Sequence, residues 1–250
     1  MLKNERENEI LQILTDKKFI TVRELSHILY ASESSIRRDL SNLEKKGLAK
    51  RSYGGAELVL NAGNIAPFSQ RALHNTSEKK IIAKKAIQFV SDGDIIFFDQ
   101  SSSALFAANE VKNAKKAVTV VTNNLEIASL FTDTDLEVHI TGGYLSPNNR
   151  NCILGSDAIA SFENFHADLI FFSSRAMSLD GVIYDCNREE ICIRNTMLKN
   201  SKNKIFLCDT EKFGRTAGFK QCTLDDTDVL ITEKEPKDVP EFFSEVTTVI

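Results

Sequence analysis

Basic and polar residues gather between Ser32 and Arg51, where they alternate with apolar residues at helical spacing. Ile36, Leu40 and Leu43 share one helical face, which can be buried while the other side chains of the helix face outward. Arginine and lysine bind phosphates, and arginine, asparagine and serine can bond to base edges in the major groove of DNA. The stretch is therefore predicted to bind DNA through Ser34, Ser35, Arg37, Arg38, Asn42, Lys45, Lys50 and Arg51.

Three helices are expected to position these side chains. Residues 3–15 carry one apolar stripe and predict a first helix, which residues 19–20 would close. A capping box predicts a second helix over residues 21–29. Ser32 can cap the third helix, and Gly47 stands where a left-handed C-cap would end it. The tight turn between the second and third helices indicates a helix-turn-helix.

A short hairpin is expected directly after the third helix. Residues 48–52 and 56–60 flank Tyr53-Gly54-Gly55, where the glycine pair permits the positive φ of a tight turn. Lys50 and Arg51 lie on this predicted wing and could contact phosphate or the minor groove. The alternative is a basic hairpin that is merely solvated.

The positive charge is concentrated in the part of the chain predicted to bind DNA. Residues 1–60 carry 11 Lys and Arg against 9 Asp and Glu, whereas the remainder carries 20 against 26. The overall net charge is −4. This acidic balance does not exclude DNA binding, because charges are screened beyond about 10 Å at 0.1 M salt and the local field decides.

The cysteine pattern indicates a reducing compartment. The five cysteines are odd in number and show no C-x-x-C spacing, so free thiols are expected. No apolar run approaches the roughly 18 residues of a membrane helix, and the N-terminus is charged from the outset. A cytoplasmic protein is therefore expected.

The chain divides by pattern into two unequal parts. Residues 1–60 predict the winged helix-turn-helix, and residues 61–75, with weak periodicity, predict a linker. Over residues 76–250 helices and apolar strands alternate, which is typical of an α/β domain. Continuous apolar runs at 95–98 and 169–172 suit a sheet covered on both faces. The other expected strands are 118–121, 136–141, 205–208 and 229–231, and the expected helices are 77–91, 103–111, 125–131, 189–200 and 239–245.

Polar residues that follow the predicted strands could bind a phosphate. Residues 99–103 link a buried strand to a helix, where backbone N–H groups and hydroxyls lie at a positive helix end. Because open α/β sheets bind ligands at the carboxyl ends of strands, this loop is expected to converge with residues 122–123 and 142–143. The alternatives are a polar loop with serine caps and, for Lys212, a solvated side chain. These candidate ligand residues are Asp99, Ser101, Ser102, Ser103, Thr122, Asn123, Gly142, Gly143 and Lys212.

Short motifs in a fixed order give the chain a family resemblance. In the first part they are T-V-R-E-L at 21–25, S-x-x-S-I-R-R-D-L at 32–40, L-E-K-K-G-L at 43–48 and Y-G-G-A at 53–56. In the second part they are D-G-D-x-I-F-F-D at 92–99, V-T-N at 121–123, T-G-G at 141–143, Gly155 and D-T-E-K-F-G-R at 209–215. Over nearly its whole length the chain resembles the DeoR-type transcriptional regulators.

The resemblance implies a fold, a function and partners. It implies an N-terminal winged helix-turn-helix joined to an α/β effector-binding and oligomerisation domain similar to ribose-5-phosphate isomerase and glucosamine-6-phosphate deaminase. Members of the family typically repress genes of sugar or nucleoside catabolism until a phosphorylated sugar binds. The implied partners are double-stranded operator DNA, a phosphorylated sugar effector and further copies of the chain in a homodimer or higher homo-oligomer.

Two segments depart from the family pattern. The phosphate loop of the family usually reads D-x-G-[ST]-[ST], whereas this chain has Ser101 at the glycine position. A later G-A-x-G segment is replaced by Ser173-Ser174-Arg175-Ala176. Arg175 could hold an anionic ligand or could occupy the space of a sugar. A DNA-binding regulator with a degenerate, ligand-silent effector site is therefore an alternative.

An enzyme related to sugar-phosphate isomerases or deaminases is the other alternative. Asp99, Asp185 and Glu189 could serve as acid or base, but a shared fold does not confer activity. The four histidines form no metal-binding pattern, and no G-x-S-x-G or phosphate-binding P-loop motif is present. Catalysis would also leave the basic helix unexplained. A regulator without catalytic residues, metal or cofactor is therefore expected.

Overall fold

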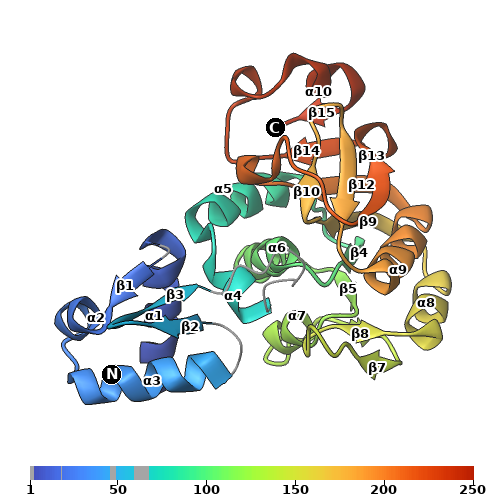
Figure 1. The fold of residues 1–250 in the computed structure, drawn as a ribbon. Coiled ribbons are helices and arrows are strands. Elements are labelled where there is room, and N and C mark those ends of the chain that lie inside the picture. The colour runs from blue at the N-terminus through green and yellow to red at the C-terminus, as the bar shows by residue number, and fades with distance from the viewer. Residues whose placement is uncertain (1–2, 18, 46–48, 59–67) are drawn as a thin grey trace. The chain divides into compact units, whose positions relative to one another are not determined.

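The computed structural model describes residues 3–17, 19–45, 49–58 and 68–250. By their internal contacts the residues form two compact units, 1–74 and 75–250, which Figure 1 colours from blue at the N-terminus to red at the C-terminus. No helix in the described ranges is both long and apolar enough to cross a membrane.

The first unit combines helices with a small antiparallel sheet of order β1-β3-β2. Its elements are α1 (Lys3–Lys17), β1 (Phe19–Thr21), α2 (Val22–Ile28), α3 (Glu33–Lys45), β2 (Ala49–Ser52), β3 (Gly55–Leu58) and α4 (Phe68–Leu73). Helices α1 to α3 and the β2–β3 hairpin confirm the predicted winged helix-turn-helix. Gly47, the predicted end of the third helix, lies outside the described residues.

Residues 19–20 belong to a strand, which corrects the prediction that they close the first helix. Ile20 lies opposite Ala56 of β3 and is buried, so packing against the wing fixes this segment as β1. A Cβ atom on Gly55 would lie 2.4 Å from the carbonyl oxygen of Ile20, so the close approach of β1 and β3 requires glycine there. A strand of three residues is too short for alternation to reveal it in a sequence.

Local hydrogen bonds begin α2 and α3 where the sequence predicted. The Thr21 hydroxyl accepts from the N–H of Glu24 at 3.1 Å, and the Glu24 carboxylate accepts from the N–H of Thr21 at 3.0 Å. The Ser32 hydroxyl accepts from the N–H of Ser35 at 3.2 Å. The helices then share one apolar core with the sheet, made by Ile10, Leu11, Leu14, Ile20, Val22, Leu25, Leu29, Ile36, Leu40, Leu43, Ala49 and Ala56.

The second unit is built on a seven-stranded parallel sheet of order β15-β14-β12-β9-β4-β5-β6. From β4 (Ile95–Phe98) the chain runs outward through β5 (Thr119–Thr122) and β6 (Val138–Ile140). It then returns to the other side of β4. That side holds β9 (Ala167–Phe172), β12 (Ser201–Leu207), β14 (Val229–Ile231) and β15 (Thr248–Val249). The strand order thus reverses between β4 and β9, the point at which open α/β sheets bind ligands.

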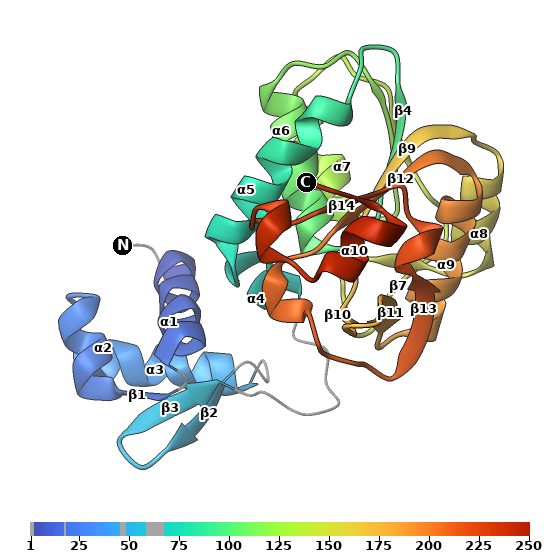
Figure 2. The same cartoon turned by 90° about the horizontal axis from the view of Figure 1, so that it is seen from above.

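Helices cover both faces of the parallel sheet, as the apolar strands predicted. Figure 2 shows α5 (Thr76–Ala86), α6 (Ser102–Asn113) and α7 (Leu125–Leu130) on one side of the sheet, and α8 (Ser156–Glu163) and α9 (Arg188–Lys199) on the other. Helix α10 (Glu241–Val246) adds Phe243 to the second side. Ile96 and Phe98 pack into the core on the side of α5, α6 and α7, and Phe97 packs into the core on the side of α8 and α9. One apolar strand therefore supplies both cores.

Several short elements escaped the sequence prediction. They are the hairpin of β7 (Tyr144–Leu145) and β8 (Ile153–Leu154), helix α8, strand β15, and an antiparallel sheet of β10 (Ala176–Met177), β11 (Val182–Asp185) and β13 (Phe219–Thr223). Helix α4 lies within residues 61–75, which the sequence predicted as a linker, and it groups with the first unit. These segments span two to eight residues, so their helical or strand periodicity is weak.

Candidate DNA-binding surface and ligand site

Helix α3 presents a polar face opposite a fully buried stripe. Ile36, Leu40 and Leu43 are at most 1% exposed and anchor the helix in the core of the first unit. Arg38 and Lys45 lie on the exposed side. Because the apolar stripe fixes the rotation of the helix, it also fixes the direction in which these two cations point.

Arg38 and Arg37 differ in their partners. Within the described ranges, no side chain forms a hydrogen bond or ion pair with the guanidinium of Arg38. The guanidinium of Arg37 is also exposed, but it donates to Glu33 one helical turn earlier at 3.1 Å. Arg38 is therefore available to a base edge without a competing carboxylate, whereas the guanidinium of Arg37 is shared with Glu33.

Asn42 faces helix α1, which corrects the prediction that it faces outward. Its Nδ2 donates to Glu7 of α1 at 3.2 Å. One turn away, Arg6 of α1 donates from Nε to Asp39 at 2.6 Å, and the Asp39 carboxylate is buried. The hydrogen bond to Asp39 raises the pKa of Arg6. These contacts orient the recognition helix against α1, and they remove Asn42 from the exposed polar face.

The wing is fastened to the recognition helix. Arg51 donates from Nε to Glu44 of α3 at 2.6 Å, and its backbone N–H donates to the same carboxylate at 3.1 Å. The hydrogen bond from the backbone N–H of Arg51, and to a smaller extent the bond from its side chain, lower the pKa of Glu44. Lys50 lies 3.6 Å from Glu57 across the hairpin. Arg51 therefore positions the wing as well as exposing a cation, while Lys50 remains largely in water.

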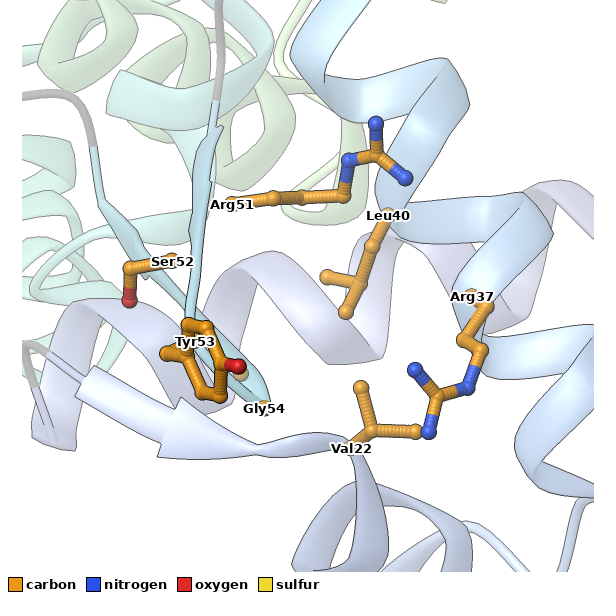
Figure 3. A pocket seen from close by; sticks show the side chains of 8 residues that line it. Val22, Arg37, Leu40, Arg51, Ser52, Tyr53 and Gly54 are labelled. Atoms are coloured by element: carbon orange, nitrogen blue, oxygen red, sulfur yellow. The ribbon is translucent and has the colours of Figure 1, made fainter.

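A hollow lies between the wing and the middle of the recognition helix (Figure 3). Arg37 enters it from α3, Arg51 enters it from β2, and the fully exposed Tyr53 stands at the wing turn. Two guanidinium groups beside a concave surface can bind a phosphate of a DNA backbone. The hollow is lined by Val22, Arg37, Leu40, Arg51, Ser52, Tyr53, Gly54 and Gly55.

The predicted serines lie in the first turn of α3. The hydroxyls of Ser34 and Ser35 lie 3.0 and 2.9 Å from that of Ser32. Ser34 is exposed, whereas Ser35 is half-buried. Ser34 therefore shares the exposed side of the helix with Arg38, and Ser35 contributes mainly to the cap.

In the second unit, the loops after β4 and β9 meet at the reversal of strand order. Asp99 follows β4, and its carboxylate accepts from the N–H of Ser173, which follows β9, at 3.2 Å. The same carboxylate accepts from the N–H of Ser101 at 2.9 Å. Asp99 is fully buried, so in this structure it holds the two loops together.

A buried arginine that the sequence reasoning missed completes this arrangement. Arg194 of α9 donates to Asp99 and to Asp185, each at 2.9 Å, and to Gln221 at 2.8 Å. Burial alone would lower the pKa of Arg194, but the carboxylates of Asp185 and Asp99 raise it overall. The guanidinium therefore stays charged. Its burial could have been predicted from its spacing, because Arg194 lies one helical turn after Ile191 on the buried stripe of α9.

Ser101 replaces the family glycine without backbone strain. Its φ of −79° is in the extended region, and its hydroxyl accepts from the N–H of Ala104 as the N-cap of α6. The next two residues, Ser102 and Ser103, form the buried first turn of α6. Arg175, in the second departing segment, also has a negative φ and is exposed. Neither departure therefore forces the loops out of a conformation that a non-glycine residue adopts.

The loops after β5 and β6 lie at the same edge of the sheet. The N–H of Thr141 donates to the carbonyl of Thr122 at 3.2 Å. Thr122 and Asn123 are buried, and Asn123 donates from Nδ2 to the carbonyl of Ile153 at 3.0 Å. Gly142 and Gly143 are exposed, and Gly143 has a φ of +123°. A Cβ atom there would meet the Leu154 carbonyl at 2.2 Å, so this loop needs the glycine.

Lys212 places a partly accessible cation beside the β9 loop. Its ammonium donates to the Ser173 hydroxyl at 2.8 Å and lies 3.2 Å from the carboxylate of Asp209, and its side chain is 19% exposed. A lysine ammonium and a helix N-terminus such as that of α6 are groups that can bind an anion. The structure thus places the predicted ligand residues along one sheet edge, with Asp99, Thr122 and Asn123 as internal supports.

The carboxylates considered for catalysis already have partners. Asp99 and Asp185 share Arg194, and Glu189 accepts from the hydroxyl of Tyr144 at 2.5 Å. The hydrogen bond to Glu189 raises the pKa of Tyr144. In the described part of the chain, no group of three or more His, Cys, Asp or Glu residues could hold a metal ion. The geometry therefore favours structural roles for these acids over proton transfer.

Comparison with known proteins agrees with this arrangement. The DeoR-like helix-turn-helix domain matches residues 6–61, and the DeoR C terminal sensor domain matches residues 74–234. The chain is 35% identical over 234 residues to the HTH-type transcriptional regulator GolR of Listeria innocua, a match that covers 92% of this chain and 91% of GolR. It is 29% identical over 237 residues to the HTH-type transcriptional repressor GlcR of Bacillus subtilis, covering 94% and 90% of the two chains.

A third relative and a solved structure extend the comparison. The glycerol-3-phosphate regulon repressor of Escherichia coli is 26% identical over 237 residues, covering 94% of this chain and 93% of that protein. Ribose 5-phosphate isomerase A of Methanocaldococcus jannaschii aligns with a TM-score of 0.40 at 14% identity, over 54% of this chain and 53% of that chain, a likeness that carries no inference about activity. The similar proteins are named regulators and repressors, so the chain is a DNA-binding regulator rather than an enzyme. It belongs to the DeoR family of transcriptional regulators, with the helix-turn-helix domain of that family followed by its sensor domain.

Proposed function

We propose that the protein is a sequence-specific repressor of sugar or carbohydrate metabolism genes that acts on operator DNA in the cytoplasm. The observation that carries the proposal is the unpaired, exposed Arg38 on a helix whose opposite face is fully buried, as seen in the described ranges. A rigidly presented guanidinium can bond bidentately to the O6 and N7 of a guanine in the major groove. Ser34 and Lys45 on the same side would contact neighbouring bases or phosphates.

The size of the recognition helix supports binding as a homodimer or a higher homo-oligomer. Helix α3 has 13 residues, which at 1.5 Å per residue gives a length of roughly 20 Å. Helices of this kind contact only a few base pairs within one major groove, and paired half-sites about one helical turn apart supply the remaining specificity. Two copies of the recognition helix on a palindromic operator therefore satisfy the need for specificity.

A phosphorylated sugar is the effector that the sensor domain suits best. Lys212 supplies a cation, and Ser101 begins α6 at the point where the strand order reverses. One relative is named a glycerol-3-phosphate regulon repressor, which agrees with a phosphorylated ligand. Binding would release the operator if the ligand has a higher affinity for the DNA-free state, since equal affinity for both states shifts no equilibrium.

DNA binding is tested with a duplex from the promoter region of the gene itself. Fluorescence anisotropy at a fixed salt concentration compares this duplex with a scrambled one of equal length and composition, and footprinting locates the site. We expect the promoter duplex to bind on the order of a thousandfold more tightly. Equal affinity for the two duplexes would refute sequence-specific control.

The effector is tested by calorimetry with a panel of phosphorylated compounds. The panel contains glycerol 3-phosphate, ribose 5-phosphate, glucose 6-phosphate, fructose 6-phosphate, glucosamine 6-phosphate and inorganic phosphate. We expect one sugar phosphate to bind the wild-type protein, to bind Lys212→Ala at least tenfold more weakly, and to weaken operator binding. Absence of heat from every compound at millimolar concentration would instead favour a ligand-silent regulator. Turnover of a bound compound would support an isomerase or deaminase.

A further inference from the structure

The first residue of the second unit is bonded to the loop that carries Lys212. Asn75 has a left-handed backbone, with φ 51° and ψ 46°, and occupies the N-cap position of α5. Asparagine at this position usually caps the helix with its side chain. In α5 the Asn75 side chain makes no capping bond. Its Nδ2 instead donates to Asp209 at 3.1 Å and to Glu211 at 3.0 Å.

The carboxylate of Asp209 connects Asn75 to Lys212. Its Oδ1 accepts from Asn75, and its Oδ2 lies 3.2 Å from the ammonium of Lys212. Asp209 is 3% exposed. Burial alone would raise the pKa of Asp209, but Lys212 and then Lys79 of α5 lower it overall. The first turn of α5 therefore helps to compensate the same buried charge that Lys212 compensates.

An anion that binds Lys212 must compete with this carboxylate. Lysine has three donors, and the ammonium of Lys212 already faces Ser173 and Asp209. A phosphate oxygen close to the ammonium would repel the carboxylate of Asp209 and take part of its compensating charge. Because Asp209 is buried, the stabilisation that its carboxylate loses must come from its other partners at the start of α5, the hydrogen bond of Asn75 and the charge of Lys79.

We propose that Asp209 acts as a relay, through which the occupancy of Lys212 changes the contact of Asn75 at the boundary between the sensor domain and the DNA-binding unit. The inference rests on the proposed function, because it takes Lys212 to be the residue that meets the effector's phosphate. It adds a route for the signal. The effector site and the start of the sensor domain are joined by the carboxylate of Asp209, which both sides share.

The test replaces Asn75 by glycine. Glycine keeps the left-handed backbone and removes both side-chain hydrogen bonds, so Asn75→Gly isolates the contact. The matched control is Lys115→Gly, because Lys115 is exposed and has the same left-handed backbone, with φ 52°, outside the Asp209 cluster. A second variant, Asn75→Asp, tolerates this backbone and places a like charge beside Asp209. Thermal unfolding of each variant checks that it folds.

Two dissociation constants are measured for each protein. Calorimetry gives the affinity for the sugar phosphate of the panel that binds wild type most tightly, and anisotropy gives the affinity for the footprinted operator with and without that compound. We expect the compound to weaken operator binding about tenfold or more in wild type and Lys115→Gly. In Asn75→Gly and Asn75→Asp we expect this effect to fall below about twofold, while the affinity for the sugar phosphate stays within about threefold of wild type.

The other possible results show whether the relay alone is wrong or whether the proposed function is wrong as well. If wild type binds no compound of the panel, or binds one without a change in operator affinity, the proposed effector function fails and the relay fails with it. If wild type responds and both Asn75 variants respond to the same extent, the relay is wrong and the proposed function stands. If the Asn75 variants lose their affinity for the sugar phosphate, Asn75 supports the ligand site and does not transmit its signal, which also overturns the relay.

Discussion

Replacing Arg38 by alanine tests whether this side chain contributes to operator affinity without contributing to the stability of the fold. The guanidinium is exposed and lacks a partner in the described part of the chain, so Arg38→Ala should change the free energy of unfolding by less than about 0.5 kcal/mol. Any loss of operator affinity then reports the contact with DNA. Asn42→Ala is the matched comparison on the same helix, because Asn42 is half-buried and bonds to Glu7 of α1.

The two variants should show opposite effects. A bidentate contact with guanine is worth about 1–3 kcal/mol, so Arg38→Ala should bind the operator roughly 5 to 150 times more weakly. On a scrambled duplex the same change removes one cation and should cost far less. Asn42→Ala removes one hydrogen bond between helices and should lower the free energy of unfolding by about 0.5–1.5 kcal/mol, with operator affinity nearly unchanged.

The assay combines anisotropy with urea unfolding. Each protein is titrated against operator and scrambled duplexes at several salt concentrations, and the ratio of the two affinities measures specificity. Equal losses on both duplexes for Arg38→Ala would show that Arg38 contacts phosphate only. A loss of specificity in Asn42→Ala without a loss of stability would contradict the packing of Asn42 against α1.

Two further predictions concern the sensor domain. Arg194→Met leaves the buried carboxylates of Asp99 and Asp185 without their cation. The free energy of unfolding, measured by urea denaturation, should therefore fall by about 3–5 kcal/mol. A change below about 1 kcal/mol would show that the network is dispensable. Lys212 helps to depress the pKa of Asp209, so the stability that Asp209 contributes is complete above its unfolded pKa of about 4 and is lost as pH falls through the lower folded pKa. Lys212→Ala should therefore be less stable than wild type near pH 7, and the difference in free energy of unfolding between the two proteins should shrink below about pH 4. A difference that grows in acid would refute the pairing of Lys212 with Asp209.

The sequence predicted the elements whose periodicity is long or whose caps are local. The capping box at Thr21 depends on residues three apart, and the apolar run 95–98 needed only the rule that parallel strands are covered on both faces. Strand β1 was missed because a burial contact with β3 creates it, and three residues leave no pattern. Helix α4 was missed because its six residues are too few to show a helical pattern.

Side-chain roles were harder to predict than the elements that carry them. Asn42 stands at the margin between the exposed and packed faces of α3, so only the position of α1 decides which way it bonds. Arg194 could be recognised from its apolar stripe, but its partners lie in β11 and after β4, and no short spacing joins them. The sheet edge itself was predictable, because strand ends of a parallel sheet coincide.

The cations of the DNA-binding surface divide into two groups with different consequences for specificity. Arg37 and Arg51 each pair with a carboxylate that competes with a phosphate for the same guanidinium, although exposed pairs of this kind are worth only about 0–1 kcal/mol each. Their acidic partners stay on the same surface and reduce the attraction for any duplex, whatever its sequence. Arg38 has no such competitor in the described ranges, so its contact with a base is not weakened in the same way. We therefore expect the pairing to lower non-specific affinity more than specific affinity, which would help an acidic chain to discriminate its operator from the rest of the genome.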